Sequence, residues 1–390
     1  MSLWRAFVAE AMAVARDRGA LLVLVGAIVI YAFLYPQPYR AEVLKEVQVA
    51  VVDADHSRLS RQLTRMVDAH ELISVTRHVA TMADAEALAH NGQVGGILAI
   101  PADFERTVLR GERATVGVFT DAAYFLVYRQ ALTGLLEATG TLSAGIEIRR
   151  LQAQGVPDKT ARAMRDPVQL LFRPLFNPGE GYASYIVPSV LVLILQQTLL
   201  IGIGMLTGTA RERGGTGGAH PDGPLVGVLG RALFYLGLYS VHAVFYFTVV
   251  YRVFGFPEQG RPGAVIAFAL PFLLAVIFLG LALAHAFRRR ETAIQVLLFT
   301  SLPAVFLAGF SWPNEAIPRW VRALASLLPS TPGMAGFGRL NQMGATLAEV
   351  RPEWILLWAL AAAYFLAAWA LAARRHASAA QESTQLRDAG

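Results

Sequence analysis

The sequence of 390 residues contains no cysteine and only two lysines, Lys45 and Lys159. Without cysteine the chain can form no disulfide bond and no thiolate zinc site, and it has no cysteine nucleophile. Neither lysine follows a glycine, so the pattern G-x-x-x-x-G-K-[ST] is absent and a Walker-A nucleotide site is excluded. The nucleophile pattern G-x-S-x-G is absent as well. We therefore expect no catalytic residue and no cofactor on this chain.

Two short patterns are similar to metal-binding motifs but do not match them fully. His70-Glu71 begins like the zinc motif H-E-x-x-H, yet position 74 is a serine. The stretch from Asp53 to His56 is better explained as the end of a strand followed by a helix cap. The sequence therefore predicts no metal site.

Charged residues are scarce. They make up only 16% of the chain, and the mean hydropathy is +0.46, which indicates a polytopic membrane protein with one water-soluble part. The net charge of +6 comes almost wholly from arginine. Because these arginines lie beside apolar runs, they favour a role in membrane topology over binding to nucleic acid, and we expect no nucleic-acid partner.

The longest apolar run begins at Gly181 and continues for about 30 residues without a charged side chain, which is enough to span a bilayer as a helix. The first apolar run lacks the cleavage site of a signal peptide, so we expect it to remain as an anchor. The sequence predicts six membrane-spanning helices, at 19–36, 181–209, 232–254, 264–287, 294–310 and 353–373.

The arginines also predict the orientation, because short cytoplasmic loops collect positive charge. Twelve arginines accompany the N-terminal segment 1–18, the loop 210–231, positions 288–290 and the tail 374–390, compared with six in the opposite short loops and span ends. We therefore expect both chain ends in the cytoplasm and the insert 37–180 outside it. Segment 1–18 has the pattern of an amphipathic helix on the membrane surface, and the alternative is a plain start of the first span.

The insert 37–180 has the pattern of a small α/β domain, in which strands alternate with helices. The expected strands are 46–53, 73–79, 95–101 and 114–121. The expected helices are one capped by Asp55 or Ser57 and ending near Ala69, one at 81–92, one with Pro101 in its first turn, and a long one at 124–154. The fold class is thus a polytopic α-helical membrane protein with an inserted extracytoplasmic α/β domain.

The segment 311–352 is semi-apolar and interrupted by prolines at positions 313, 318, 329 and 332. This pattern favours short half-helices that enter the outer leaflet, which are tolerated where protein covers their backbone. A plain surface loop is the alternative.

No Asp or Glu lies within the six apolar runs when the last is counted from Trp354 to Ala373. Carriers coupled to protons or sodium usually need carboxylates inside the membrane, so a secondary transporter is disfavoured. The polar residues that could line a translocation path are Gln196, Gln197, Thr198, Thr300 and Ser301. Hydrogen bonding between helices is an equal alternative for the two glutamines, and it is the favoured role for His242.

The order of these parts resembles the permease subunit of ABC type-2 exporters. The similarity covers nearly the whole chain and rests on the order of several local patterns: EVQVAVVDADHSRLSRQL, GGILAIPADFERTVLRGERATVGVFTDA, the run from LFNPGEGYASYIVPSV into ARERG, and GFSWPNEAIPRWVRALASLLPSTPG.

The resemblance implies a dimer with a second copy or a sister permease, and a cavity lined by the second and fifth spans. It also implies an ATPase subunit that holds ATP and magnesium, optionally a periplasmic adaptor protein, membrane lipids as surroundings, and a bacterial inner-membrane location. The loop after the second span, here Arg211–Arg231, would form a coupling helix seated on the ATPase. In this sequence the implied ATPase-coupling residues are Arg211, Glu212, Arg213, Leu225, Val226, Leu229 and Arg231. A polar insert, GGAHPDG, departs from the family pattern in this loop.

We therefore expect an exporter permease for a lipophilic or amphipathic substrate. Two other classes remain open at this stage. A membrane sensor with an external ligand domain would need a cytoplasmic output module, but only a short tail follows Ala373. A membrane-embedded lipid-modifying enzyme would need an acid–base pair at the bilayer interface, and none is evident.

Overall fold

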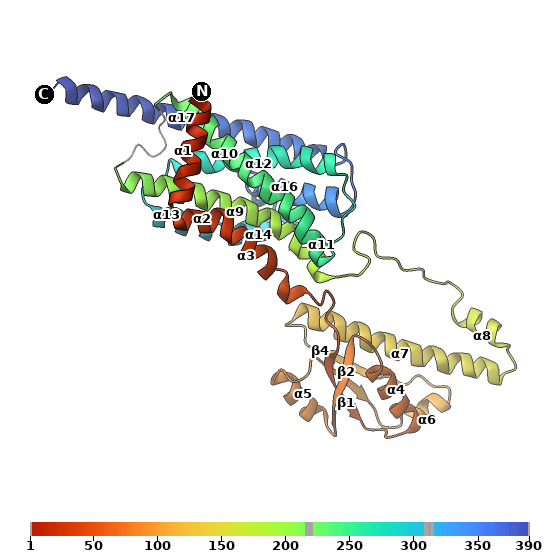
Figure 1. Cartoon of the computed structure of the whole chain (residues 1–390). Coiled ribbons are helices and arrows are strands. Elements are labelled where there is room, and N and C mark those ends of the chain that lie inside the picture. Colours follow the sequence, from red (N-terminus) through yellow and green to blue (C-terminus); the bar gives the residue numbers. More distant parts are fainter. Residues whose placement is uncertain (1, 215–220, 308–311, 313–315, 389–390) are drawn as a thin grey trace. The chain divides into compact units, whose positions relative to one another are not determined.

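The computed structural model describes residues 2–214, 221–307, 312 and 316–388, with side chains described to residue 378. The chain divides into two compact units (Figure 1). A helical unit comprises Met1–Glu42 and Pro174–Gly390, and an α/β unit comprises Val43–Arg173.

The helical unit begins with α1 (Ser2–Arg16). The side chain of Asp17 then accepts hydrogen bonds from the backbone N–H groups of Gly19 and Ala20, both at 3.0 Å, and so caps the next helix. That helix consists of α2 (Arg18–Leu21), η1 (Leu22–Gly26) and α3 (Ala27–Leu34), followed by the short turn η2 (Gln37–Tyr39). The remaining helices are α9 (Tyr182–Glu212), α10 (Pro224–Val244), η3 (Phe245–Val250), α11 (Tyr251–Phe254), α12 (Pro262–Ala284), α13 (Arg290–Phe299), α14 (Ser301–Leu307), α15 (Arg319–Ala325), α16 (Ser330–Phe337), η5 (Gly338–Gln342) and α17 (Arg351–Asp388).

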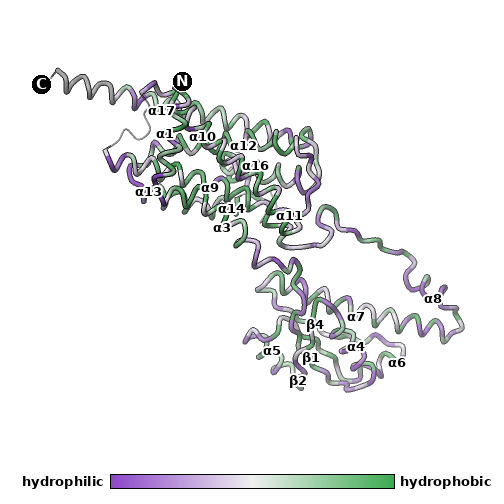
Figure 2. Tube along the Cα trace, viewed as in Figure 1, coloured by the Kyte–Doolittle hydropathy of each residue, from purple (hydrophilic) through white to green (hydrophobic). Residues whose placement is uncertain are grey.

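Within the described residues, six helices are long and apolar enough to cross a membrane, as the sequence predicts for a polytopic membrane protein. They are Arg18–Tyr39, Tyr182–Glu212, Pro224–Phe254, Pro262–Ala284, Arg290–Leu307 and Arg351–Ser378. Figure 2 shows the hydrophobic residues concentrated along these helices. Residues 308–310, predicted as the end of the fifth span, lie outside the described residues.

Two helices extend by two turns or more beyond the ranges that hydropathy predicts. The helix that begins with α10 starts at Pro224, so residues 224–231, expected in a loop, form its first two turns. Proline suits this position because the first turn of a helix has no partner for its N–H. The last helix continues to Asp388 through most of the expected tail 374–390. A hydropathy pattern detects only the part of a helix that is apolar enough to lie in hydrocarbon. Polar turns at the ends of the same helix are therefore not predicted by it.

The helix α9 forms the core of the helical unit, where it packs against α12, α13 and α16. In its most apolar stretch 78% of the residues are buried inside the chain, compared with 17% in the Arg290–Leu307 helix. The half-helix α16 also lies inside this core, and Pro332, Met334 and Phe337 are buried. Ser330, at the start of α16, contacts Gln196 midway along α9. The segment 311–352 therefore holds a packed half-helix rather than only a surface loop, although residues 311 and 313–315 are outside the described part.

The α/β unit contains a four-stranded sheet in the order β2-β1-β3-β4. Its strands are β1 (Val47–Asp53), β2 (Ile73–Val79), β3 (Gly96–Ile100) and β4 (Gly117–Thr120). The first three are parallel, and β4 is antiparallel to β3. All four strands fall within the predicted ranges. The helices of this unit are α4 (Arg58–Asp68), α5 (Met82–His90), α6 (Phe104–Leu109), α7 (Phe125–Ala153) and α8 (Asp158–Arg165).

Alternation along β1 divides the core of the α/β unit between the two faces of the sheet. Val49 and Val51 share one cluster with Leu63 of α4 and Leu135 of α7. Ala50 and Val52 share the other cluster with Ala85 of α5. The helix α6 begins at Phe104, so the expectation that Pro101 lies in its first turn is wrong. Asp103 precedes it in a left-handed conformation with φ 64°, and Pro101 ends the strand region instead.

Candidate functional site

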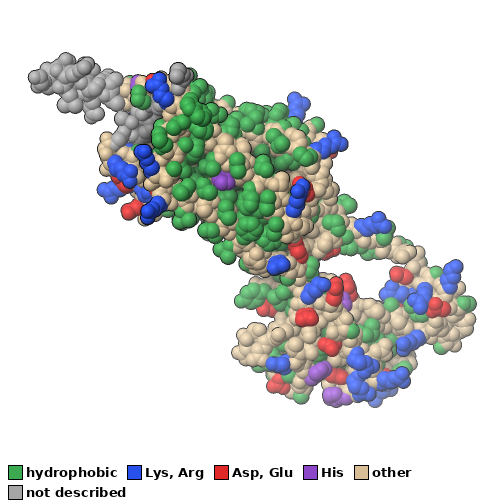
Figure 3. Space-filling view, in the orientation of Figure 1, with side chains coloured by type: hydrophobic (Ala, Val, Ile, Leu, Met, Phe, Trp, Pro, Cys, Tyr) green, Lys and Arg blue, Asp and Glu red, His purple; other side chains and the backbone are tan. Residues whose placement is uncertain are grey.

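The candidate site lies at one end of the helical unit, which we call the arginine-rich end. It is built from the last turns of α9, the first turns of α10 and α13, the loop between α12 and α13, and the α1–α2 junction. Both chain termini are drawn at this end in Figure 1. On the face shown in Figure 3, hydrophobic side chains cover the middle of the helical unit and blue side chains gather at this end.

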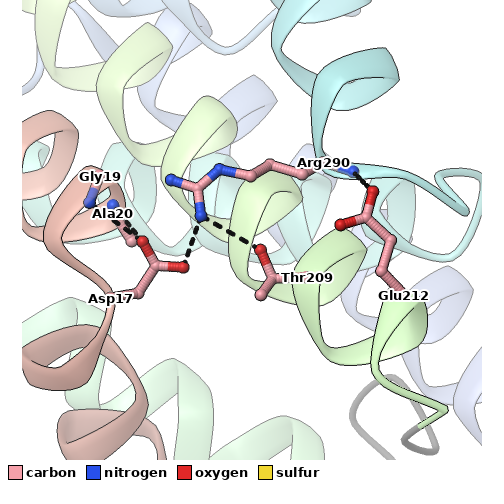
Figure 4. Close-up of polar contacts among 6 residues, drawn as sticks. All are labelled: Asp17, Gly19, Ala20, Thr209, Glu212 and Arg290. Atoms are coloured by element: carbon pink, nitrogen blue, oxygen red, sulfur yellow. Dashed lines mark hydrogen bonds and ion pairs between the residues drawn. The ribbon is translucent and has the colours of Figure 1, made fainter.

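Arg290 joins three helices at the arginine-rich end (Figure 4). Its guanidinium lies 2.7 Å from the carboxylate of Asp17 and donates to the hydroxyl of Thr209 at 3.3 Å. Its backbone N–H donates to Glu212 at 2.9 Å, so Glu212 caps the start of α13. Burial alone raises the pKa of Asp17, but hydrogen bonds from Ala20, Arg290 and Gly19 outweigh it and lower that pKa below its ordinary value. Asp17 is therefore a charged partner that holds α2 against α9 and α13.

Glycine allows the helices to approach closely at this point. A Cβ added at Gly208 of α9 would lie 2.6 Å from the backbone nitrogen of Arg290, and one at Gly19 would meet the guanidinium of the same residue. Since backbone cannot yield as a flexible side chain does, Gly208 is the tighter restriction. The hydrogen bonds and the ion pair of Arg290 thus lie where the backbones of α9 and α13 are in close contact.

A second ion pair joins α1 to α10. Glu10 lies 3.0 Å from Arg231, and the side chains of both are only 12% exposed. The hydroxyl of Tyr235 donates to Glu10 at 2.6 Å, and Arg231 donates to Thr207 of α9 at 3.2 Å. A buried pair of this kind is costly to break because the remaining charge is left without a partner. The N-terminal helix is therefore held to the bundle at two points, Glu10 and Asp17.

Positive charge exceeds negative charge around His285. The guanidinium of Arg211 donates to the carbonyls of Phe287 and His285, and Arg375 donates to the carbonyl of His285. Within the described residues, Nε and Nη2 of Arg211 and Nδ1 of His285 are buried without a hydrogen-bond partner. Burial, and then the charges of Arg375, Arg231 and Arg211, lower the pKa of His285 to about 4. This histidine is therefore neutral near pH 7.

Three of the predicted ATPase-coupling residues, Arg211, Glu212 and Arg231, belong to these contacts. Arg213 is exposed. Leu225, Val226 and Leu229 lie on the first two turns of α10, with Leu225 exposed and the other two half-buried. Local sequence patterns do not identify Glu10, Asp17 and Arg290 as partners in these contacts. Asp17 stands directly before a helix start, so its capping role could have been found, but its partner 273 positions away could not.

The predicted path residues of α9 lie in the interior of the chain. Gln196 is 1% exposed; its amide donates to the Ser330 hydroxyl at 3.0 Å and its oxygen accepts from the Ser330 N–H at 2.7 Å. Thr198 accepts a hydrogen bond from Tyr239 at 3.0 Å. Gln197 is buried, and within the described part its side-chain oxygen has no partner. The hydrogen bond of Gln196 joins two helices, which is the alternative left open for it.

Thr300 and Ser301 bond within their own helical turn, to the carbonyls of Leu297 and Leu298. The structure therefore does not join them to the polar residues of α9 by hydrogen bonds. His242 lies 3.0 Å from the carbonyl of Leu24, which confirms the expected bonding to a neighbouring helix. Among the described residues, no group of three or more His, Asp or Glu side chains is placed to hold a metal ion.

Residues 18–370 match the family described as "ABC-2 family transporter protein". The chain belongs to this family. This ABC-2 protein is 22% identical over 341 residues to the linearmycin resistance permease protein LnrN of Bacillus subtilis, with 83% of this chain and 86% of LnrN covered. It is 25% identical over 327 residues to the inner membrane transport permease YhhJ of Escherichia coli, with 81% of this chain and 82% of YhhJ covered.

These findings make the ABC-2 protein a membrane permease of an ABC transporter, and its relatives are transport permeases. ABC-2 permeases in general work with ABC ATPase partners. At the arginine-rich end of this chain, charged residues from several helices converge.

Proposed function

We propose that this ABC-2 permease forms the membrane path of an ATP-driven exporter for lipophilic or amphipathic compounds. In this proposal a separate ATPase subunit, which holds ATP and magnesium, binds at the arginine-rich end. That end faces the cytoplasm, and the α/β unit lies on the other side of the membrane, as the distribution of arginine favours. One relative is named a resistance permease, which fits export.

The observation that carries this proposal is the pair of ion contacts, Glu10–Arg231 and Asp17–Arg290. They connect the N-terminal helix to the ends of α9, α10 and α13, so a push on any one of these segments is transmitted to the others. Energy from a partner would therefore reach α9, the most buried span, without any nucleotide site on this chain. Such a partner shifts the equilibrium between two arrangements of the helices only if it binds them with different affinity.

The surface of α13 and α14 supports a dimeric path. Phe299 is 81% exposed, Leu302 63% and Phe306 59%, on the least buried of the six spans. A second copy of the chain or a sister permease would cover this apolar face, and Thr300 and Ser301 would then lie beside the interface. In this dimer Gln196 and Thr198 would not line the path, because they lie in the interior of the chain. They would instead hold the helices beside the path together through their hydrogen bonds with Ser330 and Tyr239.

The proposal is tested by purifying the tagged chain from its native membranes in mild detergent and assaying vanadate-sensitive ATP hydrolysis. We expect an ATP-binding subunit to copurify and its turnover to respond to lipophilic compounds. Purification of the chain without any ATPase would contradict the proposal and favour a sensor. A copurified ATPase indifferent to lipophilic compounds would reject only the cargo class. A periplasmic adaptor in the same preparation would identify a further partner.

The contribution of the Arg290 contact is tested by comparing Arg290→Ala with Arg289→Ala. Arg289 is the exposed neighbour, with no ion pair among the described residues, so it controls for loss of one positive charge. We expect the compound-dependent change in ATP hydrolysis to be lost in Arg290→Ala and kept in Arg289→Ala. Equal behaviour of the two variants would show that the contact does not transmit the signal.

A further inference from the structure

The segment Val168–Phe176 exposes an unusual amount of apolar surface. It is neither helix nor strand and precedes α9. Its sequence is VQLLFRPLF, with prolines at 167, 174 and 178 that disfavour both helix and sheet. The exposed fractions of its large apolar side chains are Val168 81%, Leu170 86%, Leu171 75%, Phe172 70%, Leu175 76% and Phe176 43%. Surface of this kind is strongly favoured to leave water, so it needs a partner.

The end of this segment is fixed to the first turn of α9. The side chain of Asn177 donates to the carbonyl of Gly181 at 2.8 Å and accepts from its N–H at 3.3 Å. The N–H of Tyr182 donates to the carbonyl of Glu42 at 2.8 Å, and both carboxylate oxygens of Glu42 accept from Ser184. Leu175 and Phe176 therefore have a defined place beside the start of a membrane-spanning helix.

Tyrosines mark the level of the membrane surface at this point. Tyr35, Tyr39, Tyr182 and Tyr185 form a chain of ring contacts with centroids 5.4 to 6.3 Å apart. Tyrosine is enriched where a span meets the headgroup region, because its ring is apolar and its hydroxyl is polar. At about 3.5 Å per residue, Leu175 can lie no further than about 25 Å from Tyr182. The apolar segment is therefore within reach of that surface.

We propose that Val168–Phe176 lies on the lipid surface and inserts its Leu and Phe side chains at the boundary between headgroups and acyl chains. The single charge of the segment, Arg173, has no ion-pair partner among the described residues and would reach the lipid phosphates. The chain between the two units is then an interfacial anchor in addition to the six spans. This inference requires only that α9 spans the membrane, and it is independent of cargo and of the ATPase.

Because the chain has no cysteine, single cysteines can be introduced without any background. Leu171→Cys is labelled with a nitroxide and reconstituted at low protein density into vesicles of phosphatidylethanolamine and phosphatidylglycerol. Glu112→Cys, an exposed site in the α/β unit, is the aqueous reference, and Val241→Cys, 66% exposed on α10, is the lipid reference. Power saturation then compares accessibility to oxygen, which dissolves in lipid, with accessibility to a water-soluble nickel chelate.

We expect the label at position 171 to be accessible to oxygen and protected from nickel, close to the label at 241. Nickel accessibility like that at 112 would overturn the proposal, because the segment would then lie in water. Protection from both reagents, together with a disulfide-linked dimer of Leu171→Cys after oxidation, would also overturn it and would assign the surface to a second copy of the chain. Gln169→Cys serves as a second position, so that a local defect of the 171 variant is recognised.

Discussion

The two ends of α9 are held in different ways. At the arginine-rich end, two carboxylates and two arginines from four segments form ion pairs across helices. At the opposite end, one carboxylate, Glu42, accepts from Ser184, Gln342 donates to the carbonyl of Ser184, and tyrosine rings pack together. Charge–charge contacts couple whole helices at the first end, whereas hydrogen bonds with Glu42 and Gln342 fix the first turn of α9 at the second.

This difference bears on which end of α9 responds more strongly to a movement of the neighbouring helices. Interactions between charged partners in a partly desolvated place are strong and respond to changes of distance between helices. Hydrogen bonds to a single turn, even those with a charged acceptor such as Glu42, respond mainly to local geometry. In the proposed function, the arginine-rich end therefore receives the signal from the ATPase, and the tyrosine-lined end holds α9 at the membrane surface.

The largest effect is expected from breaking the buried pair at the arginine-rich end. Arg231→Ala should lower the free energy of unfolding by about 3–5 kcal/mol, because Glu10 is left buried without its ionic partner. The measurement is thermal unfolding of the purified chain in detergent. The double variant Glu10→Leu with Arg231→Met should recover most of the loss. An unchanged melting temperature for Arg231→Ala would refute the importance of the pair.

The second largest loss of stability is expected from a steric change at Gly208. Gly208→Ala should destabilise the chain by about 1–3 kcal/mol, because the added Cβ meets the backbone of Arg289 and Arg290. Gly237→Ala in α10 is the matched control, since nothing lies within 4 Å of a Cβ there, and alanine favours a helix. Unfolding in detergent should therefore separate the two variants, and similar losses in both would argue against a close α9–α13 contact.

At the opposite end, Glu42→Gln should cost about 1 kcal/mol, because a charge-assisted acceptor of the Ser184 hydrogen bonds becomes a neutral one. The same thermal measurement applies, and Glu46→Gln, an exposed acid outside the helical unit, controls for loss of a carboxylate. A loss as large as that of Arg231→Ala would remove the difference between the two ends.

At neutral pH the smallest effect comes from His285, because its lowered pKa changes stability only below about pH 6.5. Its folded pKa is depressed from 6.5 to about 4, so between these values the unfolded chain binds a proton that the native chain does not. Stability should therefore fall as pH falls from about 6.5 to about 4. His285→Asn should flatten this part of a melting-temperature profile recorded against pH. A wild-type profile that is flat across this window would contradict the buried neutral state.

Hydropathy and positional patterns predicted the parts of the fold that depend on local sequence. The six spans, the four strands and the Ser57 cap of α4 all follow from apolar runs, alternation or capping residues. The family resemblance also pointed to Arg211, Glu212 and Arg231, which take part in the contacts described above, and their coupling to an ATPase stays a prediction.

Partners that lie far apart in sequence could not be predicted in this way. Glu10 and Tyr235 are 225 positions apart, and Gln196 and Ser330 are 134 positions apart. Nothing in the local pattern of Gln196 distinguishes a side chain that bonds to a half-helix from one that lines a path. The start of α10 was missed for a different reason, because its first two turns carry glycine and arginine that lower hydropathy without preventing a helix.

The most direct test of the role of the arginine-rich end is site-specific photo-cross-linking in native membranes. A benzophenone side chain is placed at Leu225, 45% exposed at the start of the Pro224–Phe254 helix, or at Val253, 59% exposed at the other end of the same helix. The proposed arrangement predicts a cross-link from position 225 to an ATP-binding subunit and none from position 253. A cross-link from 253 and none from 225 would contradict it.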